Sequence, residues 1–410
     1  MKKKILSYTA LASLVVSAIC IFLITKLRIG KIKSIPNCPL RFLVSEHDKL
    51  IRFHPKEFSK PVPHMKIPQH PYMAPNPGSN MHCDAYISDT YEASGPLGIK
   101  SEVISRTEGF GGYGTITFDS NRRLVGVYGN GMKLRLELMD PDTLEKMASY
   151  DLPPRSWTFF VRGIRPWEYL GAGMYFYLDH LDRAVVPTTR NTVQVVQSPD
   201  WEKRKKFELV REYDLSRYMV PGTDDSPAFV LPDWDGKYYW FASVQGVVGT
   251  INVDSGTVRT TRLKGELVEN SFAVGEDGVF IISDQAMYRF SHDGTGNPVI
   301  DWRSGYSKAA ERKAGLISVG SGTSVTITGT PQEGLIVIAD NAEPRINLLF
   351  IKRSDGAIVG SVPLFAEGKS ATDLTAIAFA HADESGKGNG VYSAIVENNW
   401  GPHTFPFSRC

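Results

Sequence analysis

The sequence predicts an all-β protein, a six-bladed β-propeller with an N-terminal transmembrane helix. Three observations lead to this fold class. One hairpin pattern recurs six times after residue 110, no helical pattern of convincing length separates the copies, and an apolar stretch of about twenty residues follows the first four residues. The composition fits a globular domain, because 42% of the 410 residues are hydrophobic and 22% are charged.

Residues 1–33 are predicted to form a signal anchor, a transmembrane segment with basic flanks. MKKK precedes the apolar stretch ILSYTALASLVVSAICIFLI, and TKLRIGKIKS follows it. The apolar residues continue past Ala18, which favours an uncleaved anchor over a cleaved signal peptide. Basic residues flank both ends, so charge bias leaves the orientation open. Because large domains after a single anchor are most often exported, we expect a membrane-anchored, extracytoplasmic domain, periplasmic or at the cell surface.

Residues 34–82 are predicted to form a Pro-rich linker along the surface of the domain, and residues 83–410 to form the propeller. The prolines forbid long helices and disfavour central strands. The histidines in the linker have irregular spacing, which argues against a metal site. Cys38 and Cys83 can pair outside the cell, and two free thiols are the alternative.

The recurring unit is an apolar run, an acidic or Gly-containing turn, and a second apolar run. Its copies start 44 to 59 residues apart, a period typical of propeller blades. Residues 132–153 and 246–263 add a second hairpin to their units, which gives the four strands of a blade. The six copies start at Thr115, Met174, Ala228, Phe272, Ser324 and Leu374.

Closure of the ring requires two more strands, because the chain ends soon after the sixth hairpin. AYISDTYE at 85–92 and SEVISRTE at 101–108 have no other predicted partners. We expect these N-terminal strands to complete the last blade, which ties the two ends of the repeat domain together.

Polar residues adjoin the inner strands at one mouth of the predicted central channel. Their carboxylate and amide oxygens suit Ca²⁺, a possible cofactor. Asp and Asn are also the commonest turn formers at strand ends, which is the structural alternative. The predicted metal ligands are Asp225, Asn270, Asn341 and Asp373. Glu269 and Glu397 are the predicted catalytic residues, each as a ligand or a base.

The segment ENSFAVGEDGVFIISDQAMYRFSHDG at 269–294 resembles the blade repeat of six-bladed propellers of the gluconolactonase, paraoxonase and strictosidine synthase type. In the lactonases and arylesterases of that group, the resemblance implies a channel-bound Ca²⁺ that activates the substrate carbonyl or a water. Asn270 matches the ligand Asn of the motif, and Asp340 with Asn341 resembles a later ligand pair. The chain departs from the motif where Glu269-Asn270-Ser271 replaces Pro-Asn-Gly. SDQAMYRF and DNAEPRINLLF also resemble uncharacterised exported bacterial propellers, which implies no activity.

Two functions follow from these features, a ligand-binding or protein-interaction module and a Ca²⁺-dependent lactonase or arylesterase. The binding module ranks first, because the sequence contains no complete catalytic constellation. A quinoprotein dehydrogenase is a third possibility, and the spacing of the seven tryptophans argues against it. No nucleic-acid partner is expected, because a net charge of +2 gives no strong field of one sign. The substrate, ligand or partner is not identified by the sequence.

Overall fold

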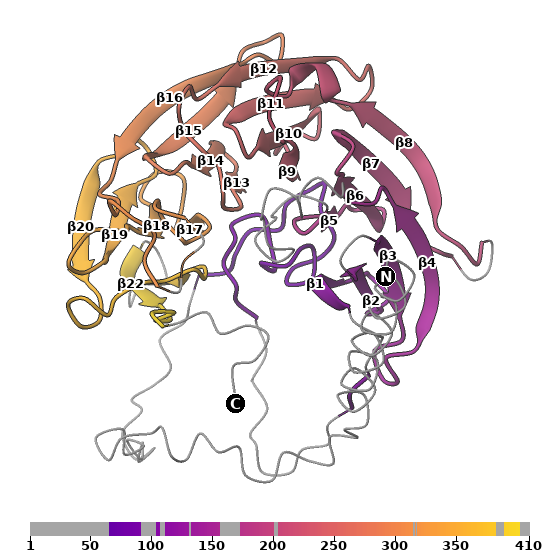
Figure 1. Cartoon of the computed structure of the whole chain (residues 1–410), viewed down its shortest axis with the longest axis horizontal. Helices are drawn as coiled ribbons and strands as arrows, with labels where there is room; N and C mark the ends of the chain where they lie inside the picture. Colours follow the sequence, from indigo (N-terminus) through magenta and orange to yellow (C-terminus); the bar gives the residue numbers. More distant parts are fainter. Residues whose placement is uncertain are drawn as a thin grey trace, which may run out of the picture. The chain divides into compact units, whose positions relative to one another are not determined.

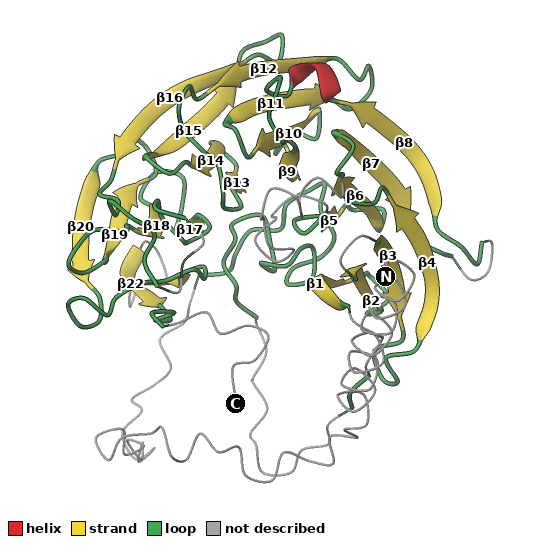
Figure 2. Ribbon diagram, viewed as in Figure 1, coloured by secondary structure: helices red, strands yellow, loops and turns green. Residues whose placement is uncertain are grey.

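Strands make up almost all of the regular structure in the computed structural model (Figure 2). It describes residues 65–91, 104–106, 111–130, 133–155, 173–200, 204–314, 316, 318–382 and 389–401, all within the unit formed by residues 61–403. The predicted anchor and the linker up to residue 64 lie outside these residues. In the described part of the chain, no helix is long and apolar enough to cross a membrane.

The first three sheets each contain four antiparallel strands in chain order. The first contains β1 (Gly112–Phe118), β2 (Leu124–Gly129), β3 (Leu134–Met139) and β4 (Lys146–Leu152). The second contains β5 (Tyr177–Leu178), β6 (Arg183–Pro187), β7 (Thr192–Gln197) and β8 (Glu208–Asp214), followed by a 3₁₀ turn at Ser216–Tyr218. The third contains β9 (Pro227–Pro232), β10 (Tyr238–Ser243), β11 (Val247–Asn252) and β12 (Val258–Arg262).

The remaining sheets continue the same order. The fourth contains β13 (Ala273–Gly275), β14 (Gly278–Ile282), β15 (Ala286–His292) and β16 (Pro298–Gly305). The fifth contains β17 (Thr326–Thr328), β18 (Leu335–Ala339), β19 (Asn347–Lys352) and β20 (Ile358–Pro363). The sixth pairs β21 (Ile377–Ala382) with β22 (Asn389–Ile395), and its described residues contain these two strands.

The sheets follow one another around a common centre, with the first strand of each innermost (Figure 1). Neighbouring inner strands contact one another, β9 with β13, β13 with β17, and β17 with β21. Sheets in meander order around one axis are the architecture of a β-propeller. Each of the six predicted hairpins is present, and five of them extend into four-stranded sheets.

Burial along the strands explains their sequences. Every residue of β9 (PAFVLP) and β10 (YYWFAS) is buried, because both faces of the sheet pack against neighbouring sheets. Trp240 on β10 packs 6.2 Å from Phe290 on β15, ring centre to ring centre. Trp302 on β16 donates to the backbone oxygen of Arg353 at 3.2 Å, which joins the fourth and fifth sheets. These two tryptophans act as the predicted blade-packing aromatics.

In its described residues, the segment before the first sheet does not form the two strands that the sequence predicts at 85–92 and 101–108. Residues 85–91 form turns and irregular backbone, and Ile87 and Asp89 have positive φ angles that a strand does not accommodate. They lie at the centre of the sheets, so the prediction that they complete the last blade is wrong. Of residues 101–108, only 104–106 are described, and they belong to no strand.

Cys83 is a buried free thiol, and Cys38 lies outside the described residues.

Candidate functional site

Residues 65–91, which we call the axial segment, occupy the centre around which the inner strands lie (Figure 1). Its backbone replaces solvent as the hydrogen-bond partner of these strands. Val274 of β13 donates its N–H to the oxygen of Ala85 at 2.8 Å, and Ile327 of β17 donates to the oxygen of Tyr86 at 2.9 Å. Of residues 65–82, for which the sequence predicts a surface linker, residues 70, 73–74, 78–80 and 82 are buried, and residues 66, 69, 71–72 and 75 are exposed.

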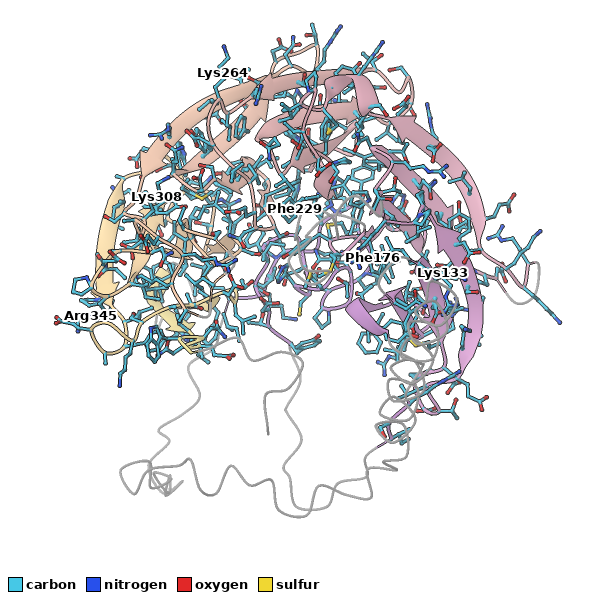
Figure 3. All side chains as sticks on the ribbon, in the orientation of Figure 1. Lys133, Phe176, Phe229, Lys264, Lys308 and Arg345 are labelled. Carbon is cyan, nitrogen blue, oxygen red and sulfur yellow. The ribbon has the colours of Figure 1, made fainter. Side chains whose placement is uncertain are left out.

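Contacts with further inner strands hold the other parts of the axial segment. Leu178 of β5 donates to the oxygen of Ser79 at 2.7 Å, and Met65 donates to the oxygen of Ala380 on β21 at 2.7 Å. Phe176 and Phe229, from the second and third sheets, lie near the same centre (Figure 3). Backbone groups buried without partners are costly, so these bonds let an irregular segment occupy a protein interior.

The axis has two ends with different side chains. At the end that we call the start mouth, strands β9, β13 and β17 begin, and the predicted site residues adjoin it. At the opposite end, the turn mouth, lie the turns that join the first and second strands of each sheet. The axial segment contributes side chains to both.

At the start mouth, His82 of the axial segment lies between a carboxylate and a hydroxyl. Its Nδ1 is 3.1 Å from Asp89, and its Nε2 is 3.4 Å from Oγ of Ser324. Oγ1 of Thr375 is 3.4 Å from Nδ1. Because a carboxylate only accepts, Nδ1–H donates to Asp89, and Nε2 faces the Ser324 hydroxyl. This order of groups is also that of a nucleophilic triad.

The surroundings of Ser324 argue against nucleophilic catalysis. Only 4% of its surface is exposed. The cavity beside His82, lined also by Tyr175 and Ser271, has a volume of about 10 Å³, which is room for about one water molecule. An ester substrate does not fit there, so we interpret the cluster as a polar attachment of the axial segment to β17.

Glu269 is the predicted site residue with the most perturbed protonation. Burial raises its pKa to about 7. A hydrogen bond from Ser318 opposes this rise, the carboxylates of Asp284 and Asp373 add to it, and the ammonium group of Lys308 opposes it. Glu269 and Asp373 therefore lie close enough to interact, as the sequence predicts for residues before two different inner strands.

Tyr175 links these carboxylates to the axial segment. Its ring lies 6.0 Å from the imidazole of His82 at an interplanar angle of 22°. Burial raises the pKa of Tyr175, and the carboxylates of Asp373 and Asp89 raise it further. The start mouth thus gathers acidic groups from the axial segment and from the fourth and sixth sheets.

Asn270 and Asn341 contact the same loop through their amide nitrogens. Nδ2 of Asn270 donates to the oxygen of Ser321 at 2.6 Å, and Nδ2 of Asn341 donates to the oxygen of Val319 at 3.0 Å. Oδ1 of Asn341 is buried without a hydrogen-bond partner. The two side chains hold the loop between β16 and β17, which is the structural alternative that the sequence left open.

Asp225 and Glu397 make local contacts. The carboxylate of Asp225 accepts from the backbone N–H of Val220 at 3.0 Å and of Gln245 at 2.9 Å, and from Oγ of Ser243 at 3.0 Å. Asp225 is the poorest fit to a metal ligand, because both of its oxygens already have partners. Glu397 is exposed and accepts from Nδ2 of Asn399 at 3.2 Å.

Among the described residues, no three His, Cys, Asp or Glu side chains are placed to hold one metal ion. The sequence predicts Glu269 and Asp373 as residues of one mouth. It missed the roles of His82 and Ser324. The only available signal was a histidine seven residues before an aspartate, and Ser324 lies 242 residues from His82 along the chain.

At the turn mouth, Tyr86 of the axial segment joins a buried ionic network. The fully buried Arg353 contacts Glu276 at 2.7 Å and Asp277 at 2.5 Å, and donates to the Tyr86 hydroxyl at 2.9 Å. Tyr86 in turn donates to Glu276 at 2.5 Å. Burial acts to raise the pKa of Glu276, but the hydrogen bonds from Tyr86 and Arg353 outweigh it and hold that pKa below its usual value.

No protein-family model matches the sequence, and no curated protein matches it either. Solved β-propellers resemble the fold. The Swd1 (Cps50) propeller domain of Myceliophteria thermophila has a TM-score of 0.41 and 9% identity, over 69% of this chain and 84% of that one. BamB from Moraxella catarrhalis has a TM-score of 0.38 and 14% identity, over 70% and 74%. A chain of the Mitotic Checkpoint Complex has a TM-score of 0.43 and 9% identity, over 74% and 80%. These likenesses concern the fold alone.

Proposed function

We propose that the protein is a non-catalytic interaction module, a membrane-anchored, extracytoplasmic six-bladed β-propeller that binds a protein partner. One observation carries the proposal, the axial segment at the centre of the sheets. In propellers of the lactonase type, the resemblance implies catalysis in the central channel. Here residues 65–91 occupy that place, and the start mouth leaves a cavity of about 10 Å³ beside His82. The protein partner then binds on the outer surface of the propeller.

The partner surface that we propose is the outer rim of the fourth and fifth sheets. Its five large apolar side chains are each 42% to 53% exposed. Apolar side chains grouped on the surface are typical of interaction sites, whereas single ones are ordinary. On the neighbouring outer strand β12, the exposed residues are Arg259, Thr260 and Arg262 instead. The rim residues are Val299 and Ile300 on β16 and Ile358, Val359 and Val362 on β20.

Site-directed photo-crosslinking in cells that express the full chain tests this function. A photoreactive p-benzoylphenylalanine replaces Val359 in one variant and Thr260 in a matched control. Both positions are exposed on outermost strands, and they differ in the apolar character of their surroundings. We expect a discrete crosslinked species from position 359 that position 260 does not give. The same crosslinks from both positions, or none from position 359, would contradict the proposed surface.

The second candidate is a Ca²⁺-dependent hydrolase of the gluconolactonase or paraoxonase type, with Glu269 as base or ligand. The observation in its favour is that the carboxylates of Asp284 and Asp373 each raise the pKa of Glu269, because a bound cation would relieve this repulsion. Thermal unfolding with Ca²⁺ and with EDTA separates the two functions. The interaction module predicts equal midpoints. A Ca²⁺-dependent rise that Asp373→Asn abolishes, together with lactone or aryl ester hydrolysis, would favour the hydrolase.

A further inference from the structure

A cavity of about 480 Å³ lies at the turn mouth, between the axial segment and the turn that joins β1 to β2. Its volume falls within the range of small-molecule sites, roughly 300 to 1,000 Å³. Two segments far apart in the sequence form its walls. The side chains that matter here are Pro75, Asn76, Pro77, Tyr91, Phe118 and Arg122.

The two walls are held together by backbone contacts. Phe118 donates its N–H to the oxygen of Gly78 at 3.3 Å, and the hydroxyl of Thr117 also donates to this oxygen. A Cβ at Gly78 would lie 3.2 Å from Cβ of Phe118, so only glycine allows this approach without displacement. The cavity is therefore bounded by fixed backbone.

The apolar part of the lining is aromatic and proline-rich. Phe118 is 39% exposed, and Tyr91, the last residue of the axial segment, is 59% exposed. Pro75 and Pro77 add rigid rings. Flat apolar surfaces of this kind accept an aromatic ring at small entropic cost, because few side-chain torsions have to be fixed.

The charged side chains that line the cavity are Asp119 and Arg122. The buried carboxylate of Asp119 contacts Arg123 at 2.6 Å and accepts from two backbone N–H groups. Arg122 is exposed, and its guanidinium has no hydrogen bond or ion pair within the described residues. A guanidinium binds a carboxylate through two parallel hydrogen bonds.

We propose that this cavity binds a small aromatic carboxylate, with its ring between Phe118, Tyr91 and the proline rings and its carboxylate on Arg122. The site lies at the turn mouth and does not depend on the partner surface of the outer rim. A neutral aromatic molecule satisfies only the apolar walls, and a simple anion satisfies only Arg122.

Equilibrium dialysis of the full chain in amphipol, with a protein-free amphipol blank, tests the site. The probes are 1-naphthoate and the neutral 1-naphthamide. We expect saturable binding of 1-naphthoate and at least about tenfold weaker binding of 1-naphthamide, because a charge-assisted hydrogen bond is lost. Equal binding of the two probes, or no saturable binding of 1-naphthoate, would overturn the proposal.

Variants assign the binding to the cavity. Arg122→Gln is expected to weaken 1-naphthoate binding about tenfold and to leave 1-naphthamide binding unchanged. Arg190→Gln is the matched control, since Arg190 is also exposed, lies in the turn between β6 and β7, and does not line the cavity. Phe118→Leu is expected to weaken both probes. Unchanged 1-naphthoate binding by Arg122→Gln, or an equal loss in Arg190→Gln, would contradict the site.

Discussion

At the scale of single residues, the raised pKa of Glu269 makes the stability of the protein depend on pH. Its folded pKa of about 7 lies above the ordinary value of 4.5, so the folded protein holds this proton more tightly than the unfolded chain does. The stabilisation is complete below pH 4.5 and is lost as pH rises towards 7. Glu269→Gln removes this loss. As pH rises from 4 to 8, we expect the free energy of unfolding of the variant to increase by up to about 3 kcal/mol relative to that of wild type.

Denaturant unfolding of both proteins at several pH values measures this difference. Glu397→Gln is the control, because Glu397 is exposed and its removal should leave the pH profile unchanged. Parallel profiles of wild type and Glu269→Gln across this range would show that the carboxyl group is not perturbed as described.

The roles of single residues were the least predictable feature of the site. The sequence predicts Asp225, Asn270 and Asn341 as oxygen donors beside strands, yet their contacts are those of turn and loop residues. Sequence cannot separate the two roles, because the same side chains serve both. His82 meets Ser324 only through the packing of the axial segment against β17, a contact with no local pattern.

At the scale of elements, the buried network of Arg353 attaches the axial segment to the fourth and fifth sheets. Arg353→Ala leaves Glu276 without its cation and removes the nearer of the two arginines beside Asp277. It also removes the hydrogen bond to the Tyr86 hydroxyl, which keeps only Glu276 as its partner. We expect a loss of about 3 kcal/mol or more in the free energy of unfolding, measured with denaturant. Arg303→Ala is the control, since Arg303 also contacts a glutamate and a tyrosine, Glu266 and Tyr288, but its side chain is 47% exposed. Its loss should cost less than about 1 kcal/mol. Equal losses in the two variants would contradict a special role for the network.

The contact between the fifth and sixth sheets depends on a glycine. A Cβ at Gly322 would lie 2.0 Å from the backbone oxygen of Thr372, which cannot move away as a flexible side chain could. Gly322→Ala is expected to cost about 1 to 3 kcal/mol in denaturant unfolding. At Gly294 a Cβ would meet open space, so Gly294→Ala should change stability by less than about 0.5 kcal/mol. A neutral Gly322→Ala would mean that the two sheets lie further apart.

Elements were predictable wherever their signal is local. Each of the six hairpins carries its own apolar runs and turn residues, and all six form. The axial segment has no such signal. Its prolines and positive φ angles forbid regular strands, and they are equally compatible with a surface linker and with a buried irregular segment. Only the hydrogen bonds to β5, β13, β17 and β21 distinguish the two.

At the scale of the whole molecule, the axial segment changes what the fold can do. A propeller with an open channel offers a site on its axis, whereas residues 65–91 fill this axis and leave the outer rim and the turn-mouth cavity as binding surfaces. The segment also contacts sheets that are distant in the sequence, so its removal should destabilise the entire domain. The central claim is that this segment is a permanent part of the interior.

Hydrogen exchange of the full chain, followed by mass spectrometry, tests this claim most directly. Most residues between 74 and 89 are buried, and the segment's own N–H groups have acceptors: those of Cys83 and Ile87 donate to the oxygens of Asn80 and Asp84. We predict that peptides covering residues 74–89 exchange as slowly as those covering β13 and β14. Exchange of the segment within seconds, with the strands still protected, would show that the axis is open and would contradict the account.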